Sequence, residues 1–269
     1  MNHRIEDRTW IQEFYDAAAD WWGFSWYEGE NLQPRLERVK RFAGPPPKRL
    51  LELAAGTGET AAFLAAAGYA VTALDLSVKN YELMSQVAQK YPLLTALQGD
   101  YLTAAIPGTF DAVCLFESFG LGSDREQRQL LRRIAAEWLA PGGVVIMDVY
   151  QPFGPIRLAG TAQSLDRLED VPGSVDMTER SYYDAVLGRW IDEWEPVENI
   201  AAARRQSVRC YTPADLLLLL EGTGFRIAHA EFAGEAFDPA PAQVSTANLL
   251  QNYQIDYTYA VVLKRESEL

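Results

Sequence analysis

Short apolar runs alternate with longer helical patterns between residues 49 and 149. Buried strands are predicted where apolar residues run together, and helices where apolar positions recur about every 3.6 residues. The predicted strands span 49–54, 69–75, 93–97, 110–116 and 144–149, and the predicted helices span 59–67, 78–90 and 125–139. Strands that alternate with helices of this length form βαβ units and a parallel sheet. Right-handed crossovers place the carboxyl ends of the strands along one edge, where ligands bind.

The pattern changes after Tyr150. Residues 181–184 and 189–194 alternate polar and apolar positions around a turn near Leu187 and Gly188, and residues 206–211 predict a third strand. Such alternation is typical of an antiparallel sheet, so an antiparallel β insertion is expected over residues 151–210. Thr212 and Pro213 then predict a helix start. Strands at 225–230 and 257–263 complete the sheet.

The N-terminal part is rich in aromatic residues. Trp10, Phe14, Ala17 and Trp21 fall at helical spacing. This pattern has two compatible interpretations, a helix that packs on a core and a segment that also covers an active site. Three prolines at 45–47 end the segment, because proline cannot continue a helix or join a sheet interior.

Composition and charge limit the kinds of partner that this protein can bind. The chain has 24 Lys and Arg against 37 Asp and Glu, a net charge of −13, which repels phosphate backbones and anionic lipid. Nucleic acid and membrane surfaces are therefore not expected as partners. Two cysteines form neither a disulfide framework nor a four-ligand zinc site, and no metal site is expected. The acidic start and the short apolar block at 216–220 predict neither a signal peptide nor a membrane span, so a cytoplasmic protein is expected.

Acidic residues and glycines gather where the predicted strands end. Gly56 and Gly58 lie between a strand and a helix, where glycines let backbone amides approach a ligand. Asp75 ends the second strand, where an acid accepts hydrogen bonds from a ribose diol. Asp100 follows the third strand at the same edge. A nicotinamide cofactor is disfavoured, because Ala61 stands where a third glycine would complete the dinucleotide pattern.

Together these features resemble the class I S-adenosylmethionine-dependent methyltransferases, strongly over residues 45–150. The resemblance is greatest to small-molecule members that act on amines or amino sugars and carry a β insertion after strand five. It implies an α/β, doubly wound, mostly parallel seven-stranded Rossmann-like sheet with an antiparallel β insertion and an N-terminal helical lid. The expected parts are the lid (1–43), the cofactor-binding core (44–150), the acceptor-side insertion (151–210) and the C-terminal part of the core (211–269).

The resemblance also assigns the cofactor, S-adenosyl-L-methionine. The residues implied to bind it are Glu52, Ala54, Gly56, Gly58, Asp75, Leu76, Asp100, Tyr101 and Phe116. In this set Glu52 would lie near the cofactor ammonium and Asp75 would bind the ribose. Ala54 departs from the family, whose usual residue at this position is glycine.

Fewer sequence features indicate which residues bind the acceptor. The candidate catalytic residues are Glu117, Tyr15 and Tyr183, and the candidate substrate-binding residues are Trp22, Ser118, Tyr150, Arg180 and Arg209. Glu117 is read either as an acidic wall beside the sulfonium or as a carboxylate at a helix N-terminus. Arg180 and Arg209 are read either as binders of a carboxylate or phosphate or as solvated strand charges.

Only His3 and His229 occur, and neither position suits a base. N- or carboxyl-methylation of a small molecule is therefore favoured over methylation of an oxygen of high pKa. Two alternatives remain. One is an enzyme that transfers or cyclises the aminocarboxypropyl arm of the cofactor and releases methylthioadenosine, and the other is a cofactor-binding partner without catalysis. The acceptor and the oligomeric state are not determined by the sequence.

Overall fold

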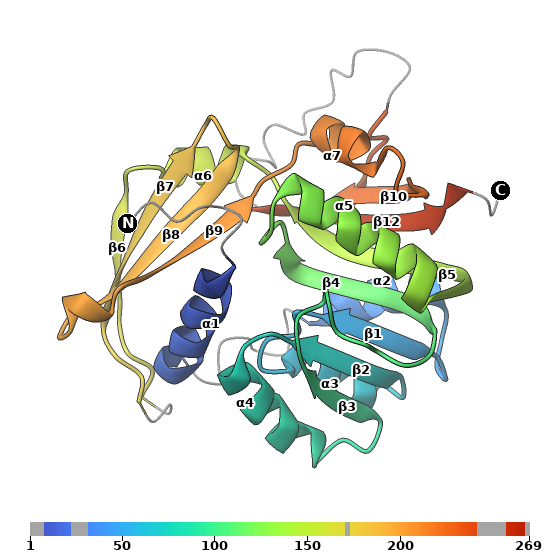
Figure 1. The fold of residues 1–269 in the computed structure, drawn as a ribbon, viewed down its shortest axis with the longest axis horizontal. Coiled ribbons are helices and arrows are strands. Elements are labelled where there is room, and N and C mark those ends of the chain that lie inside the picture. The colour runs from blue at the N-terminus through green and yellow to red at the C-terminus, as the bar shows by residue number, and fades with distance from the viewer. Residues whose placement is uncertain (1–7, 23–31, 170–172, 241–256, 267–269) are drawn as a thin grey trace.

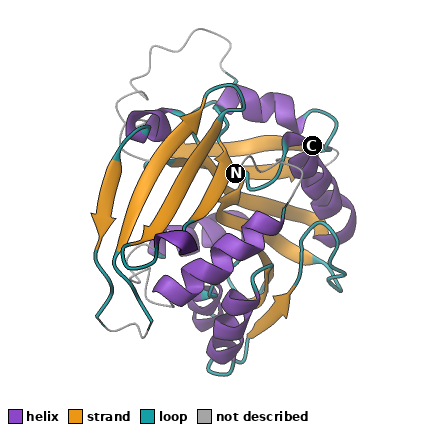
Figure 2. Cartoon of the chain, turned by 60° about the vertical axis from the view of Figure 1, so that its left-hand side comes forward, coloured by secondary structure: helices purple, strands orange, loops and turns teal. Residues whose placement is uncertain are grey.

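The computed structural model describes residues 8–22, 32–169, 173–240 and 257–266. Within them lie a large central sheet and a smaller four-stranded sheet. Figures 1 and 2 show that the smaller sheet stands beside the edge where the parallel strands end, with α1 (Thr9–Trp22) between the two.

The central sheet has eight strands in the order β11-β10-β12-β5-β4-β1-β2-β3. Strands β1 to β5 are mutually parallel, and β12 is antiparallel to both of its neighbours. Their bounds are β1 Arg49–Leu53, β2 Ala70–Asp75, β3 Leu94–Gln98, β4 Phe110–Phe119, β5 Leu139–Tyr150, β10 Phe225–Phe232, β11 Glu235–Ala236 and β12 Thr258–Arg265. The predicted mostly parallel sheet is confirmed, and the additional eighth strand is the two-residue edge strand β11. The strand order reverses between β1 and β4, the place where ligands bind in sheets of this kind.

Helices cover both faces of the central sheet. They are α2 Gln33–Ala43, α3 Glu59–Ala66, α4 Val78–Ala88, α5 Asp124–Arg133 with the π-helical turn η2 Ile134–Trp138, and α7 Pro213–Leu220. Thr212 accepts a hydrogen bond from the backbone N–H of Asp215, so the predicted cap of the last helix is confirmed. The sequence analysis included these residues in the helical lid of 1–43 but gave α2 no bounds of its own. This helix carries a residue of the site described below.

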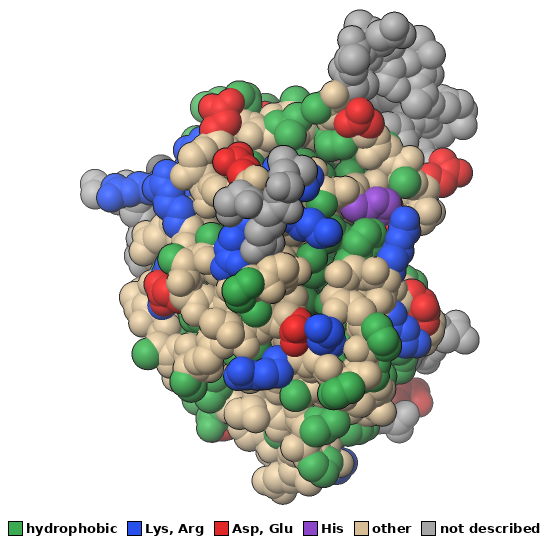
Figure 3. All heavy atoms as spheres, turned by 90° about the vertical axis from the view of Figure 1, so that its right-hand side faces the viewer, with side chains coloured by type: hydrophobic (Ala, Val, Ile, Leu, Met, Phe, Trp, Pro, Cys, Tyr) green, Lys and Arg blue, Asp and Glu red, His purple; other side chains and the backbone are tan. Residues whose placement is uncertain are grey.

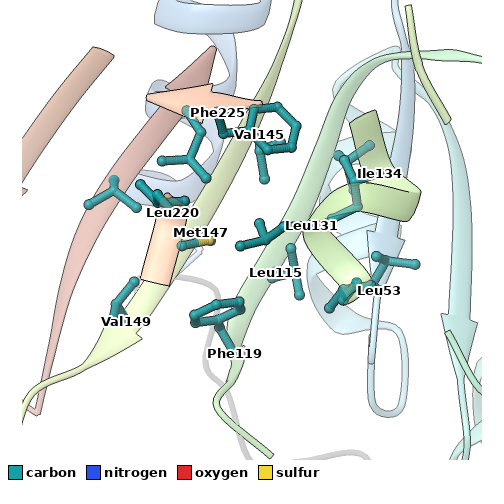
Figure 4. Close-up of a cluster of buried hydrophobic side chains, with 14 of the residues drawn as sticks. Leu53, Leu115, Phe119, Leu131, Ile134, Val145, Met147, Val149, Leu220 and Phe225 are labelled. Carbon is teal, nitrogen blue, oxygen red and sulfur yellow. The ribbon is translucent and has the colours of Figure 1, made fainter. Parts of the chain in front are cut away.

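The central sheet is buried on both faces, which explains the continuous apolar runs of its strands. On one face Leu115, Met147 and Phe119 pack against Leu131 of α5 and Leu220 of α7 (Figure 4). The opposite face packs on α2, α3 and α4 through a second cluster of buried residues that includes Leu50, Val71, Leu36, Leu64 and Met84.

The insertion forms the four-stranded antiparallel sheet, in the order β6-β7-β8-β9. Its strands are β6 Ala162–Leu165, β7 Met177–Asp184, β8 Arg189–Pro196 and β9 Arg204–Arg209, with α6 Phe153–Leu158 and the short η3 Ile200–Ala202 in the connections. The three predicted strands are β7, β8 and β9. The edge strand β6 was not predicted because it is only four residues long, without an alternating pattern, and it is largely exposed.

Helix α1 joins the two sheets. Its buried residues Trp10, Ile11 and Phe14 pack against Trp194 and Val208 of the insertion. The aromatic spacing therefore marks a packing helix, and this helix also closes one side of the cavities described below. The side chain of Trp22 and the aromatic residues at 24, 26 and 27 lie outside the described residues.

One face of the surface carries side chains of both charges. On the face turned to the viewer in Figure 3, acidic and basic side chains are interspersed among apolar ones. No helix in the described part of the chain is long and apolar enough to cross a membrane.

Candidate active site

Two adjoining cavities lie at the carboxyl edge of the parallel strands. The smaller has a volume of about 80 Å3 and the larger about 560 Å3. The residues that line both are Tyr15, Ala54, Gly56, Asn80 and Glu117. Because they share these walls, the two cavities form one site.

The glycine turn after β1 forms the floor of the site. Gly56 has a φ of 58°, and a Cβ added there would have no neighbour within 4 Å, so the turn leaves open space toward the cavity. Gly58 has a φ of 87°, and an added Cβ would lie 2.6 Å from Cγ of Met84. Gly58 therefore serves the packing of the turn on α4, whereas Gly56 leaves room for a ligand. Ala54 adopts a φ of 53°, a conformation that favours the glycine usual in the family.

Asp75 ends β2 beside this turn. Its Oδ2 accepts a hydrogen bond of 2.7 Å from the backbone N–H of Gly56, and its Oδ1 accepts one of 2.9 Å from the backbone N–H of Ser77. Helix α4 is capped by the Ser77 side chain, which accepts from the N–H of Asn80. Asp75 is therefore not the helix cap. Burial raises the pKa of Asp75 to about 6 although these hydrogen bonds oppose the shift.

Two carboxyl groups next to the turn, one buried and one partly buried, each have a buried oxygen without a hydrogen-bond partner. These atoms are Oε2 of Glu52 and Oε1 of Glu59, and both residues line the larger cavity. Burial raises the pKa of Glu52 to about 8 and that of Glu59 to about 7. A buried carboxylate without a partner is unfavourable, so a cationic ligand group would be held strongly here. The ammonium of S-adenosylmethionine is such a group, and these residues fit it.

Arg35 of α2 is the cation of this region. Its guanidinium lies 3.1 Å from Oε1 of Glu117 and donates a 2.7 Å hydrogen bond to Oγ1 of Thr60. It also lies over the ring of Phe116, 5.1 Å from the ring centre. A guanidinium in this place suits the carboxylate at the methionine end of the cofactor. The sequence analysis placed Arg35 in the helical lid of 1–43 but missed its role, because no local pattern shows that its side chain reaches Glu117.

The smaller cavity offers an apolar slot. Its lining includes Leu76, Tyr101, Ile11 and Leu121, which suits the flat face of a purine. Asp100 does not line this slot: its Oδ1 lies 3.3 Å from Arg8 and accepts the backbone N–H of Leu102 at 2.8 Å. Arg8, the partner of Asp100, lines the cavity, whereas Asp100 itself does not.

The insertion sheet forms the opposite wall of the larger cavity. Trp190, Asp192 and Trp194 alternate along β8 and all line this cavity. Gln206 of β9 lines it as well and accepts a 3.1 Å hydrogen bond from the hydroxyl of Tyr15. This wall was not predicted residue by residue, although the alternation along residues 190–194 was visible in the sequence.

The structure brings most of the predicted site residues together. Those that line a cavity are Tyr15, Glu52, Ala54, Gly56, Asp75, Leu76, Tyr101, Phe116, Glu117, Ser118 and Tyr150. Tyr15 lies between the two walls, and its hydroxyl donates a hydrogen bond to Gln206. Burial raises the pKa of this phenol and so favours its neutral form.

Three predicted residues of the insertion lie elsewhere. Arg180 and Arg209 fall on the face of the sheet opposite to Asp192, because residues one position apart in a strand point to opposite faces. Arg180 lies 3.8 Å from Glu195, and Arg209 lies 3.2 Å from Asp124. Tyr183 shares the face of Asp192 but does not line either cavity, and burial raises its pKa to about 12. The expected acceptor-side roles of these residues are therefore not supported by their positions.

No group of three or more His, Cys, Asp or Glu residues in the described ranges is arranged to hold a metal ion.

Known proteins share this fold and this domain. Residues 50–143 match a family described as a methyltransferase domain. Cypemycin N-terminal methyltransferase from a Streptomyces species is 29% identical over 136 residues, which is 48% of this chain and 55% of that protein. A ubiquinone biosynthesis O-methyltransferase from Chromobacterium violaceum is 30% identical over 152 residues, 53% of this chain and 62% of that protein. The chain thus spans between half and two thirds of the length of these two relatives.

Solved structures show the fold over nearly the whole chain. The CcbJ methyltransferase from Streptomyces caelestis has a TM-score of 0.72 at 19% identity, covering 96% of this chain and 99% of that one. CalS10, an amino pentose methyltransferase from Micromonospora echinaspora solved with S-adenosylmethionine bound, has a TM-score of 0.60 at 22% identity, covering 94% and 96%. Residues 50–143 thus match a methyltransferase domain, and the chain shares its fold with S-adenosylmethionine-dependent methyltransferases. The sequence resemblance to this class is confirmed.

Proposed function

We propose that this protein is an S-adenosylmethionine-dependent methyltransferase that methylates an amine nitrogen of a small molecule. The observation that carries the proposal is the charge of the larger cavity. Glu117, Glu179 and Asp192 line it beside the two carboxyl groups of the cofactor side, and of the described lining residues only Arg35 is a Lys or Arg. A carboxylate acceptor would be repelled by these groups, whereas an amine enters as a cation. Its ammonium then transfers a proton to one of these carboxylates, and the free amine nitrogen attacks the methyl group. The proposal thus favours N-methylation over carboxyl-methylation.

Aromatic side chains in the same cavity support a cationic acceptor. They are Phe14, Tyr15, Phe116, Tyr150, Trp190, Trp194 and Tyr257. Aromatic faces attract ammonium groups and contribute about 0.5–2 kcal/mol for each desolvated contact. They also exclude water from the reacting centre.

Similar proteins include enzymes that act on nitrogen. Cypemycin N-terminal methyltransferase and the glycopeptide N-methyltransferase MtfA are named for such reactions, and CalS10 acts on an amino pentose. The relatives also include the O-methyltransferases of ubiquinone biosynthesis. The preference for nitrogen therefore rests on the cavity of this chain.

The chain's residues would then bind and orient the reactants. When bound, the cofactor supplies a methyl group on a sulfonium, a good leaving group, so the protein mainly provides proximity and orientation. Asp75 holds the ribose, Glu52 the ammonium and Arg35 the carboxylate. The negative charge of Glu117 stabilises positive charge at the reacting centre. Tyr150 donates a 3.3 Å hydrogen bond to the backbone oxygen of Glu117 and fixes its position.

A product assay tests the proposed function. The purified protein is incubated with S-adenosylmethionine and a panel of small amines, each matched by its alcohol and carboxylate analogue, and products are identified by mass spectrometry. We expect S-adenosylhomocysteine together with an N-methylated amine. Methylthioadenosine would instead support transfer or cyclisation of the aminocarboxypropyl arm. A methylated carboxylate or alcohol without amine methylation would contradict the choice of nitrogen.

A further inference from the structure

Asp192 is a buried carboxyl group in the wall of the insertion. It lies on β8, its residue is 2% exposed, and it lines the larger cavity. Along the same face of the strand it has a tryptophan on each side, Trp190 and Trp194. An acid between two tryptophans on the inner face of a sheet is unfavourable for folding unless something compensates its charge.

Hydrogen bonds compensate it only in part. Ser181 donates a hydrogen bond of 2.6 Å to Oδ1, and Gln206 donates one of 3.2 Å to Oδ2. Among the residues that the structure describes, no Lys or Arg pairs with Asp192. The nearby titratable groups are Glu179 of β7, Tyr15 of α1 and Cys210 after β9, and none of them is a cation.

The other carboxyl groups of this cavity already have partners or face the cofactor turn. Glu117 pairs with Arg35 at 3.1 Å, and Glu179 accepts hydrogen bonds from Trp194 and Gln163. Asp192 and Glu179 are thus the two carboxyl groups on the acceptor side for which the described residues supply no partner of opposite sign. Of these two, Asp192 is the buried one, whereas Glu179 is partly exposed.

We propose that Asp192, with Trp190 and Trp194 on either side, is the site that binds the ammonium group of the acceptor. The carboxylate supplies the opposite charge, and the indole faces supply cation–π contacts that a neutral group does not gain. The Tyr15 hydroxyl donates a hydrogen bond to Oε1 of Gln206, and the amide nitrogen of Gln206 donates one to Asp192. These two hydrogen bonds link α1 to this wall of the cavity. This inference rests on the proposed function, since it names how the acceptor amine is recognised.

The ionisation of Asp192 makes such a site dependent on pH. Burial raises the pKa of Asp192 to about 7, the hydrogen bond from Ser181 lowers it, and the negative charge of Glu179 raises it. An ammonium ligand that stays protonated from pH 6 to pH 8 binds the ionised form. Its affinity should therefore rise about tenfold over this range, as the ionised fraction of a group titrating near 7 does.

Binding of two matched probes tests the proposal without turnover. Benzylammonium chloride and its neutral analogue benzyl alcohol are titrated into the full-length protein saturated with S-adenosylhomocysteine, with calorimetry and tryptophan fluorescence as readouts. We expect benzylammonium to bind at least tenfold more tightly than benzyl alcohol at pH 8, with the expected rise in affinity from pH 6. Equal affinities, or no binding of either probe at 50 mM, would overturn the proposal.

Two variants of neighbouring residues on β8 locate the effect. Asp192→Asn should abolish the preference for the cation and the pH dependence, while the affinity for S-adenosylhomocysteine stays within twofold. Glu193→Gln is the matched control, because Glu193 is on the opposite face and pairs with Arg205. If Asp192→Asn keeps the preference for benzylammonium, or if Glu193→Gln loses it equally, the site is not at Asp192. Because these readouts need no methyl transfer, they fail or succeed independently of the product assay.

Discussion

The backbone N–H of Gly56 donates a 2.7 Å hydrogen bond to the carboxylate of Asp75 and so ties the turn after β1 to the end of β2. The residue expected to anchor the ribose therefore also holds the turn on which the methionine arm of the cofactor is expected to rest. Asp75 is 6% exposed, so this hydrogen bond is shielded from water.

Asp75→Asn should reduce both cofactor affinity and stability. Hydrogen bonds to a charged acceptor contribute about 1.5–3 kcal/mol each, so losing the ribose contact should weaken binding by at least about tenfold. The free energy of unfolding should also fall by about 1–3 kcal/mol. The NH2 group of asparagine is a donor, so it leaves the backbone N–H of either Gly56 or Ser77 without an acceptor. Calorimetric titration of S-adenosylmethionine and S-adenosylhomocysteine, with denaturant unfolding, measures both. Asp111→Asn is the control, since this carboxylate lies at the start of β4 and binds Lys48. Unchanged affinity for both ligands would refute the ribose assignment.

The stability of the ligand-free protein should decrease as pH rises from 5 to 8. In the unfolded chain carboxyl groups ionise near pH 4, whereas burial raises the pKa of Asp75 to about 6 and of Glu52 to about 8. A carboxyl group with a raised pKa keeps its proton in the folded state at a pH where the unfolded chain has lost it. The stability that this group contributes is therefore lost as the pH rises through its folded pKa. Thermal melting across this range should show a falling midpoint.

Glu52→Gln isolates the largest part of this pH effect. The variant should have a flatter pH profile and a higher melting temperature than the parent at pH 8, because no buried charge forms. It should also bind S-adenosylhomocysteine at least about tenfold more weakly, through loss of one charged hydrogen bond. Glu82→Gln on the exposed side of α4 should change neither property. Parallel pH profiles for Glu52→Gln and the parent would contradict the role of Glu52.

Arg35→Met should weaken cofactor binding by about tenfold or more, the size expected from removing one charged hydrogen bond. Met keeps much of the aliphatic volume, but Glu117 loses its partner and the cofactor carboxylate loses the guanidinium. Arg41→Met on the same helix is the matched control, because the Arg41 side chain is 61% exposed. Titration of S-adenosylhomocysteine gives the affinities. Values within twofold of the parent would show that Arg35 is structural only.

Ala54→Gly should stabilise the protein. The left-handed backbone at a φ of 53° costs a residue with a Cβ about 1–2 kcal/mol. Glycine also gives the unfolded chain more conformational entropy, which lowers stability by about 0.4–1 kcal/mol. A net gain of about 0.5–1 kcal/mol in the free energy of unfolding is therefore expected. Denaturant unfolding measures it. Ala55→Gly, next to it but not left-handed, should lower stability instead. Equal losses in both variants would contradict the strain at Ala54.

The sequence by itself determined the class of the fold and the cofactor edge. Strands β1 to β5 have apolar runs because they are buried on both faces, and the acids and glycines that follow them meet at one edge in any parallel sheet. Gly56 and Asp75 were therefore chosen as candidates from local order, whereas Glu52 was assigned by the family resemblance. The same local order predicted the strands β7, β8 and β9, because alternation of polar and apolar residues marks a sheet with one buried face.

Only the tertiary structure decided which residues form the acceptor wall. Alternation shows that Arg180 and Asp192 belong to a half-buried sheet, but which face turns inward depends on how that sheet docks against α1 and the central sheet. Asp192 turned inward and Arg180 outward. Arg35 reaches Glu117 across 82 positions of the chain, a contact that no local pattern encodes. Local sequence thus determined the cofactor side of the candidate site, which lies at one edge of the parallel sheet. The packing of segments far apart in the sequence determined the acceptor side.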